Sequence, residues 1–93
     1  MRSLVYKNSF KKEFSLIEKR GKDTKKLGAV IALLQQDLPL LEKHRDHALT
    51  GNWSGFRDCH IEPDWLLIYK KGNDSDGADI LYLEATGSHA DLF

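Results

Sequence analysis

Cysteine, proline and methionine are scarce in this sequence of 93 residues, which contains one cysteine, two prolines and one methionine. A single cysteine, Cys59, cannot form an internal disulfide, so a reducing cytoplasm is the expected location. We expect the Cys59 thiol to be buried within a strand, because most free cysteines in folded proteins are buried.

Long apolar runs are also missing, since none approaches the roughly 18 residues that a membrane helix needs. The first residues lack the charged, apolar and small-residue segments of a secretory leader. Hydrophobic residues make up 41% of the chain, an ordinary share for a globular protein. We therefore expect one domain, residues 1–93, with no membrane segment.

The chain has no net charge, because 14 basic side chains balance 14 acidic ones, but the two signs are separated along the sequence. Residues 1–26 hold nine basic and three acidic side chains, whereas residues 72–93 hold five acidic side chains and no lysine or arginine. A positive region can attract a polyanion even when the whole protein is neutral. A charged helix face that is simply exposed to water has the same composition.

Two amphipathic helices are predicted in the first half of the chain. Apolar residues recur at helical spacing in segments 10–17 and 27–34. Ser9 can cap the first helix, and Asp23 or Thr24 can cap the second. The proline that follows the second segment ends that helix, because the residue before a proline avoids the α region.

Four strands are predicted, at residues 3–8, 56–61, 65–71 and 80–86. The turns between the last three strands are too short for a crossover, so these strands run antiparallel. Residues 41–55 have no sustained period and are predicted to be a loop. The order β-α-α-β-β-β predicts an α+β fold, with two N-terminal helices on one face of a twisted, mainly antiparallel four-stranded sheet.

Side chains suited to acid–base chemistry lie at the ends of the predicted strands. His60 ends one strand, Asp64 lies in the turn that follows, and His89 follows the last strand. We expect these three groups to meet on the uncovered face of the sheet. Histidine titrates near neutral pH, so a pair of imidazoles can donate and accept protons in one turnover. RNA is suited to this chemistry, because a base can activate its 2′-hydroxyl and an acid can protonate its leaving 5′-oxygen.

Other interpretations fit the same residues. Histidines and an aspartate can ligate zinc, but the spacings His44-x2-His47 and His60-x3-Asp64 match no strong zinc motif, so no metal is predicted. Asp64 is also a common turn residue, and aromatic side chains most often pack in a core. His44 is the weakest candidate, because its neighbours indicate a solvated loop or helix end.

Three segments, "DHALTGNW", "FRDCHIEPDWLLIYK" and "TGSHADLF", resemble the YafQ-like branch of the RelE/ParE toxin superfamily in their order and spacing. The resemblance is detailed over residues 41–93 and is limited to the strand-helix-helix layout before them. It implies a toxin of a type II toxin–antitoxin pair that cuts messenger RNA on the ribosome without metal or cofactor. It also implies an antitoxin of the ribbon-helix-helix, DinJ-like kind, whose complex with the toxin binds operator DNA.

The resemblance also implies a role for each matching residue. The family's active-site histidines fall on His47, His60 and His89, and its Asp-Trp pair on Asp64 and Trp65. Our hypothesis makes His89 the general acid and Asp64, together with His60, the base. His47 then orients or stabilises the phosphate. Trp65 and the matching aromatic Phe93 position a nucleobase or hold the tail.

One departure from the family bears on activity. Many relatives place an arginine before the Thr-Gly step, where this chain has Ala85. Arg57 or Lys70 would have to supply the missing charge, or cleavage would be slower. Lys25 and Lys26 are the candidates for contact with ribosomal RNA. Two other functions stay open at this point: a ParE-like toxin that poisons DNA gyrase, and a regulatory module without activity.

Overall fold

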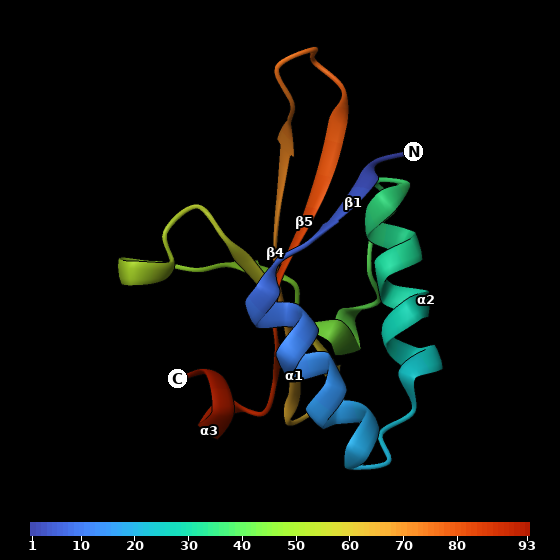
Figure 1. The fold of residues 1–93 in the computed structure, drawn as a ribbon, viewed down its shortest axis with the longest axis vertical. Coiled ribbons are helices and arrows are strands. Elements are labelled where there is room, and N and C mark those ends of the chain that lie inside the picture. The colour runs from blue at the N-terminus through green and yellow to red at the C-terminus, as the bar shows by residue number, and fades with distance from the viewer.

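Two helices cover one face of a five-stranded sheet in the structure, a computed structural model that describes residues 1–93 (Figure 1). The strands are β1 (Ser3–Tyr6), β2 (His47–Ala48), β3 (Arg57–Glu62), β4 (Trp65–Asn73) and β5 (Asp79–Gly87). The helices are α1 (Asn8–Lys19), α2 (Thr24–Gln35) and α3 (His89–Leu92), with 3-10 turns at Glu42–His44 and Gly51–Trp53. None of the helices has the length and apolar character needed to cross a lipid bilayer.

The strand order is β1-β5-β4-β3-β2, with β1 parallel to β5 and all other neighbours antiparallel. The predicted class and the four predicted strands are therefore confirmed, but the strand count was one too low. The fifth strand, β2, pairs only His47 with Asp58 and Ala48 with Arg57. Two residues cannot display the alternation that identifies a strand in a sequence, so this segment was predicted to be a loop.

The N-terminal ends of α1 and α2 make different contacts. Helix α2 begins as predicted, because the Asp23 side chain accepts a hydrogen bond of 3.0 Å from the backbone N–H of Lys25. Helix α1 begins at Asn8, so the prediction that Ser9 caps it is wrong. The Ser9 hydroxyl instead donates to the carbonyl of Glu84 in β5, at 2.6 Å. This contact joins α1 to the sheet.

The main core lies between the helices and the sheet, and its buried side chains include Phe10, Ile17, Leu27, Cys59 and Leu67. The buried Cys59 confirms that expectation, and burial raises the pKa of its thiol. Because side chains alternate along a strand, Asp58 and His60 point away from the helices. The buried side chains of Leu66 and Ile68 lie outside the main core, on this second face.

Candidate active site

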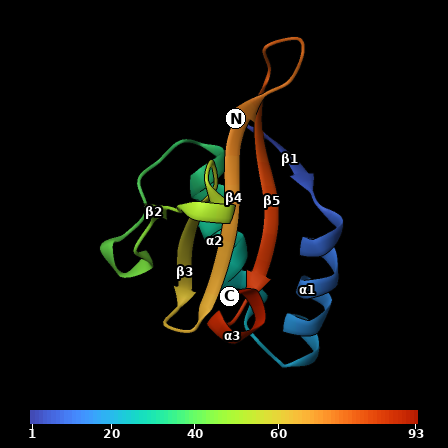
Figure 2. The ribbon, with the colours of Figure 1, turned by 90° about the vertical axis from the view of Figure 1, so that its left-hand side faces the viewer.

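Chemically active side chains gather on the face of the sheet that the two long helices leave open. Figure 2 shows β2 and α3 in front of β3 and β4, with α2 behind the sheet. Strand β2, the β3–β4 turn and α3 come from distant parts of the chain. The second face therefore brings together His47, Asp58, His60, Asp64 and His89.

Helix α3 holds His89 in place through local hydrogen bonds. Ser88 and Asp91 form a capping box, in which each side chain accepts a hydrogen bond from the other residue's backbone N–H, at 3.1 and 3.0 Å. A side chain at Gly87 would come within 3.0 Å of Asp91, so glycine lets the chain fold back here. Asp91 also forms a 2.7 Å ion pair with Arg20, at the C-terminal end of α1.

Asp64 fixes the orientation of the His89 ring. The carboxylate of Asp64 accepts two hydrogen bonds from His89, one from the backbone N–H at 3.0 Å and one from Nδ1 at 2.6 Å. These two hydrogen bonds, the backbone one above all, lower the pKa of the Asp64 carboxyl. An ionised carboxylate can only accept, so Nδ1 of His89 carries the hydrogen. Nε2 is the ring nitrogen left for a substrate.

His60 lies beside this pair. The ring centroids of His60 and His89 are 5.5 Å apart, with the planes inclined by 65°. The His60 ring is half-buried, and its backbone carbonyl accepts a 2.6 Å hydrogen bond from Nδ1 of His44. His44 is buried and holds β3 through this bond, so the low rank given to it as a catalytic candidate agrees with its position. Its predicted exposure to solvent is wrong.

Asp58 is a residue that the sequence predictions missed. Its side chain is only 6% exposed, and one carboxylate oxygen lies 3.1 Å from Nδ1 of His47. That nitrogen directs its hydrogen bond to the carbonyl of Arg45, at 2.7 Å, so the buried oxygen of Asp58 has no aligned hydrogen bond. Burial raises the pKa of Asp58, and the nearby charges of His47, His60 and His89 oppose this shift. The available signal was the i, i+2 spacing that places Asp58 and His60 on one face of β3.

The two predicted aromatic contacts have different outcomes. The indole of Trp65 is fully buried and donates a 2.9 Å hydrogen bond to the hydroxyl of Thr86, so the prediction that it binds a nucleobase is wrong. Phe93 is 60% exposed, and its ring centroid lies 6.2 Å from that of Trp53. Trp53 in turn packs edge-on against Phe56 at 5.6 Å. The aromatic surface of this face is therefore formed by Phe93, Trp53 and Phe56.

Arg57 and Lys70, the two candidates for a positive charge at the phosphate, lie on different faces of the sheet. Arg57 pairs with Asp46 at 3.2 Å and, by strand alternation, faces away from His60, so it is not the phosphate ligand that was considered. Ala85 is buried and pairs across the sheet with Ile68, which pairs with Asp58. Lys70 points to the same face as Ile68, with its ammonium 5.7 Å from the Phe56 ring centroid. Lys70 is therefore the better placed cation.

The remaining lysine candidates lie at the start of α2. Lys25 is exposed and has no ion pair, whereas Lys26 pairs with Glu62 at 2.8 Å. Lys26 and Asp64 both line a polar cleft of about 540 Å³, which connects this end of α2 with the β3–β4 turn. Lys26 thus approaches the site from its edge, whereas Lys25 does not line this cleft.

The arrangement suits proton transfer to and from a bound substrate. Two neighbouring imidazoles, one of them fixed by a carboxylate, can act as acid and base. No group of three or more His, Cys, Asp or Glu side chains is arranged to hold a metal ion.

Comparisons with known proteins agree along almost the whole chain. Residues 2–93 match a family described as the bacterial toxin of a type II toxin-antitoxin system, YafQ. The mRNA interferase toxin YafQ of Escherichia coli K12 is 43% identical over 93 residues, which cover 99% of this chain and 96% of the relative. The crystal structure of YafQ from E. coli BL21(DE3) has a TM-score of 0.88 at 41% identity, covering 100% of this chain and 99% of that one. The toxin in the E. coli DinJ-YafQ complex has a TM-score of 0.86 at 43% identity, covering 99% and 97%.

Proposed function

Because the chain belongs to the YafQ family of bacterial type II toxin–antitoxin toxins, we propose that it is an mRNA interferase that cuts messenger RNA on the ribosome. The observation that supports this proposal best is the Asp64–His89 hydrogen bond of 2.6 Å beside the ring of His60. A protein that acts only by binding, such as a gyrase poison, has no need for an imidazole fixed in this way.

The reaction needs only the RNA and protein side chains. His60, as base, removes the proton from the 2′-hydroxyl, and the 2′-oxygen forms a bond to the neighbouring phosphorus. The bond from phosphorus to the 5′-oxygen breaks, and Nε2 of protonated His89 gives that oxygen its proton. The products are a 2′,3′-cyclic phosphate and a free 5′-hydroxyl. One proton leaves the RNA and one returns to it, so no co-reactant is consumed.

Asp64 has a different role from the one first expected of it. The hydrogen bonds from His89 lower the pKa of Asp64, which makes the carboxylate a poor base. We assign to Asp64 the orientation of the His89 ring and the stabilisation of its protonated form, as the carboxylate does in serine-protease triads. His60 then remains as the base.

The other side chains of this face contact the substrate. His47, supported by Asp58, and Lys70 face the developing negative charge of the phosphate. Phe93 and Trp53 offer rings on which a base can stack, a contact worth about 1–3 kcal/mol. Lys25 and Lys26 contact ribosomal RNA.

The partner of the free toxin is a cognate antitoxin. The E. coli relative was crystallised with DinJ, and we propose an antitoxin of the DinJ-like, ribbon-helix-helix kind for this chain. Operator DNA is contacted only through that complex. No metal or organic cofactor takes part.

The test is cleavage of a reporter mRNA in a reconstituted translation reaction, with the 5′ ends mapped. His89→Ala should slow cleavage by about 10²–10⁴-fold, because the leaving oxygen loses its acid. Ser75→Ala, in the exposed β4–β5 turn, is the matched control and should cleave like the wild type. The chain is also expressed in bacteria that lack the antitoxin. Growth arrest with intact messages would indicate gyrase poisoning, and no arrest would indicate a regulatory module. Either result, or unchanged cleavage by His89→Ala, contradicts the proposal.

A further inference from the structure

A row of alternating rings and lysines crosses the second face of the sheet, beyond the histidines. Lys70 of β4 pairs with Tyr82 of β5, so both side chains point to this face. The ammonium of Lys70 lies 5.7 Å from the ring centroid of Phe56, and that of Lys7 lies 5.5 Å from the centroid of Tyr82. Phe56 comes just before β3 and Lys7 just after β1. The strand order therefore places the four side chains in the order Phe56, Lys70, Tyr82 and Lys7 (Figure 2).

These four side chains, together with Glu84, line a hollow of about 330 Å³, here called the Tyr82 hollow. A β-carbon at Gly72 would come within 3.3 Å of the Tyr82 ring, so glycine leaves the space that the ring occupies. Neither Lys7 nor Lys70 forms an ion pair, although the hollow contains an acid. The hollow therefore combines two rings with two positive charges that no acidic side chain neutralises.

This combination suits single-stranded RNA, in which bases and phosphates alternate. Proteins that bind single strands stack the bases on aromatic rings and hold the backbone with basic side chains. A lysine side chain is flexible, so each ammonium can turn from the ring to a phosphate and leave the ring face to a base. The Glu84 carboxylate repels phosphate and accepts hydrogen bonds, so it favours the amino group of a base in the middle of the hollow. An acidic peptide would use the lysines but has no need for the rings.

The Tyr82 hollow is continuous with the candidate active site. Phe56, at one end of the hollow, packs against Trp53 at 5.6 Å, within the aromatic surface beside the histidines. Lys70 lies four residues along β4 from Leu66, the partner of His60, which corresponds to about 13 Å in a strand. An RNA strand whose scissile phosphate lies at the histidines would therefore place a neighbouring nucleotide in the hollow, and not the one that is cut.

We propose that the Tyr82 hollow binds a nucleotide of the messenger RNA outside the scissile linkage, with its base stacked on Tyr82 and its phosphate held by Lys7. This inference rests on the proposed function, because the cleavage reaction supplies the RNA. A contact at this distance from the histidines moves no proton. It contributes to the affinity for the message.

The test is fluorescence anisotropy of the purified chain with a 2′-O-methylated RNA oligonucleotide, which lacks the attacking hydroxyl and stays intact. Tyr82→Ala should weaken binding by about tenfold, whereas Tyr82→Phe should bind like the wild type, because stacking needs the ring and not the hydroxyl. Lys7→Gln should weaken binding by about threefold and reduce its salt dependence by about one phosphate contact. A thermal melt establishes that each variant is folded.

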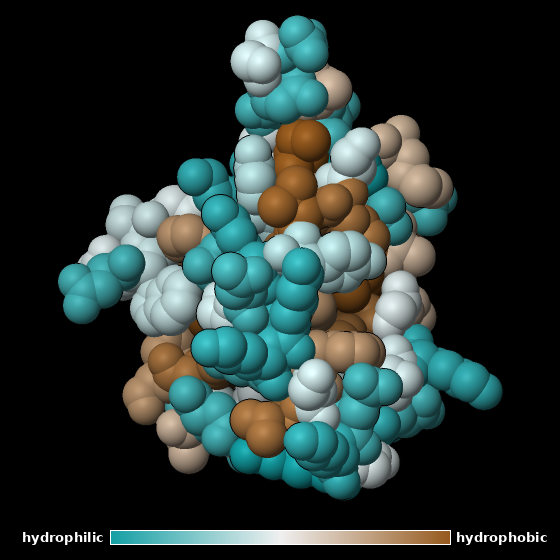
Figure 3. All heavy atoms as spheres, viewed as in Figure 1, coloured by the Kyte–Doolittle hydropathy of each residue, from teal (hydrophilic) through white to brown (hydrophobic).

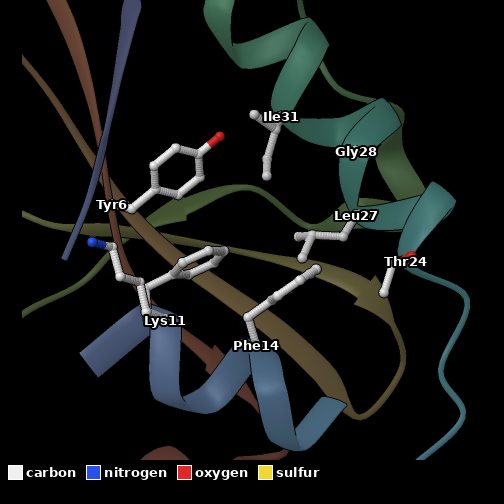
Figure 4. A pocket seen from close by; sticks show the side chains of 8 residues that line it. Tyr6, Lys11, Phe14, Thr24, Leu27, Gly28 and Ile31 are labelled. Carbon is white, nitrogen blue, oxygen red and sulfur yellow. The ribbon is translucent and has the colours of Figure 1, made fainter. Parts of the chain in front are cut away.

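Tyr6 and Lys11 supply the matched controls, because they are an exposed tyrosine and an exposed lysine on the face that the helices cover. Figure 3 shows hydrophobic atoms beside the hydrophilic surface of α1, and Figure 4 shows both control residues beside the groove between α1 and α2. Tyr6→Ala and Lys11→Gln should bind the oligonucleotide like the wild type. Equal losses in Tyr82→Ala and Tyr6→Ala would mean that any exposed ring attracts RNA, and would overturn the inference.

Two further measurements identify what occupies the hollow. Ribosomes without messenger RNA should bind the wild type and Tyr82→Ala equally, and weaker binding by Tyr82→Ala would assign the hollow to ribosomal RNA. Weaker antitoxin binding by Tyr82→Ala, with unchanged RNA binding, would assign it to a protein partner. Either result overturns the inference, as would a wild-type chain that does not bind the oligonucleotide or a folded Tyr82→Ala variant with wild-type affinity. A wild-type chain that binds the oligonucleotide through Tyr82 but cuts no translated message contradicts the proposed function alone.

Discussion

The two faces of the sheet differ in whether their buried polar groups are hydrogen-bonded. On the face toward the helices, the indole N–H of Trp65 and the hydroxyl of Tyr69 each donate a hydrogen bond, to Thr86 and Asp46. On the opposite face, Asp58 is buried with one carboxylate oxygen that accepts no aligned hydrogen bond. An unsatisfied buried charge lowers stability, and such groups are concentrated at functional sites. The difference shows that one face is organised for stability and the other for chemistry.

Breaking the Asp64–His89 contact should have the largest effect. Asp64→Asn removes the charge that stabilises protonated His89, and the amide, unlike a carboxylate, can turn its NH2 group toward Nδ1, so the tautomer of the ring is no longer fixed. We expect mRNA cleavage to fall by about 100-fold or more, with little change in Tm because Asp64 is exposed. The measurement is cleavage of the reporter mRNA beside a thermal melt.

Asp76→Asn is the control for this change, since Asp76 is an exposed acid in the β4–β5 turn. It removes the same charge at a distance from the site and should leave cleavage unchanged. Equal losses in both variants would mean that overall charge, and not the hydrogen bond to His89, determines the rate.

A substitution at each of two adjacent residues of β3 compares the faces directly. Asp58→Asn should lower cleavage by about tenfold and should raise the Tm. This loss of activity is smaller than the loss expected when a residue that transfers a proton is removed. Cys59→Ser places a hydroxyl in the main core and should cost about 1–3 kcal/mol of stability, with cleavage per folded molecule unchanged. If both variants changed stability and cleavage in the same direction, the division between the faces would be wrong.

The stability gain of Asp58→Asn should depend on pH. Burial raises the pKa of Asp58 in the folded state above its unfolded value, so the charged form destabilises the fold at neutral pH. This cost disappears as the pH falls below the unfolded pKa of about 4. The difference in free energy of unfolding between variant and wild type should therefore be largest near neutral pH and vanish in acid. A difference that grows on acidification would contradict the assignment.

Breaking the ion pair between Arg20 and Asp91, which joins α1 to α3, should have the smallest effect. Arg20→Gln removes the 2.7 Å ion pair between α1 and Asp91 of α3. We expect cleavage to fall by about threefold, because exposed ion pairs contribute little. The Arg20 guanidinium and, next, the backbone N–H of Ser88 hold the pKa of Asp91 well below its usual value. This contribution to stability is complete above the unfolded pKa of about 4 and is lost as the pH falls through the folded pKa, so the two proteins should differ constantly above about pH 5.

Lys12→Gln is the control, because it removes a charge from α1 that has no ion pair. It should change neither cleavage nor the melting curve. If Arg20→Gln were as damaging as Asp64→Asn, Arg20 would have to act on the reaction itself.

The sequence predicted this site unevenly. His60, Asp64 and His89 were identified because each stands at the end of a predicted strand, and the topology implied that these ends meet. Asp58 was missed because an acid in the middle of a strand has no local signature, although it shares a face with His60. Trp65 was misassigned because its position beside Asp64 gives no information about which face of β4 it occupies.

By itself, the sequence determined the class of fold, the two helices and the three antiparallel strands, because apolar spacing and turn residues act over a few positions at a time. It also determined which side chains can transfer protons. Only the tertiary structure decided that Asp64 binds His89, that Asp58 lies buried beside His47, and that Phe93 rather than Trp65 is exposed. These facts depend on how strands and helices from distant parts of the chain pack together, and no local pattern records burial or distance across that packing.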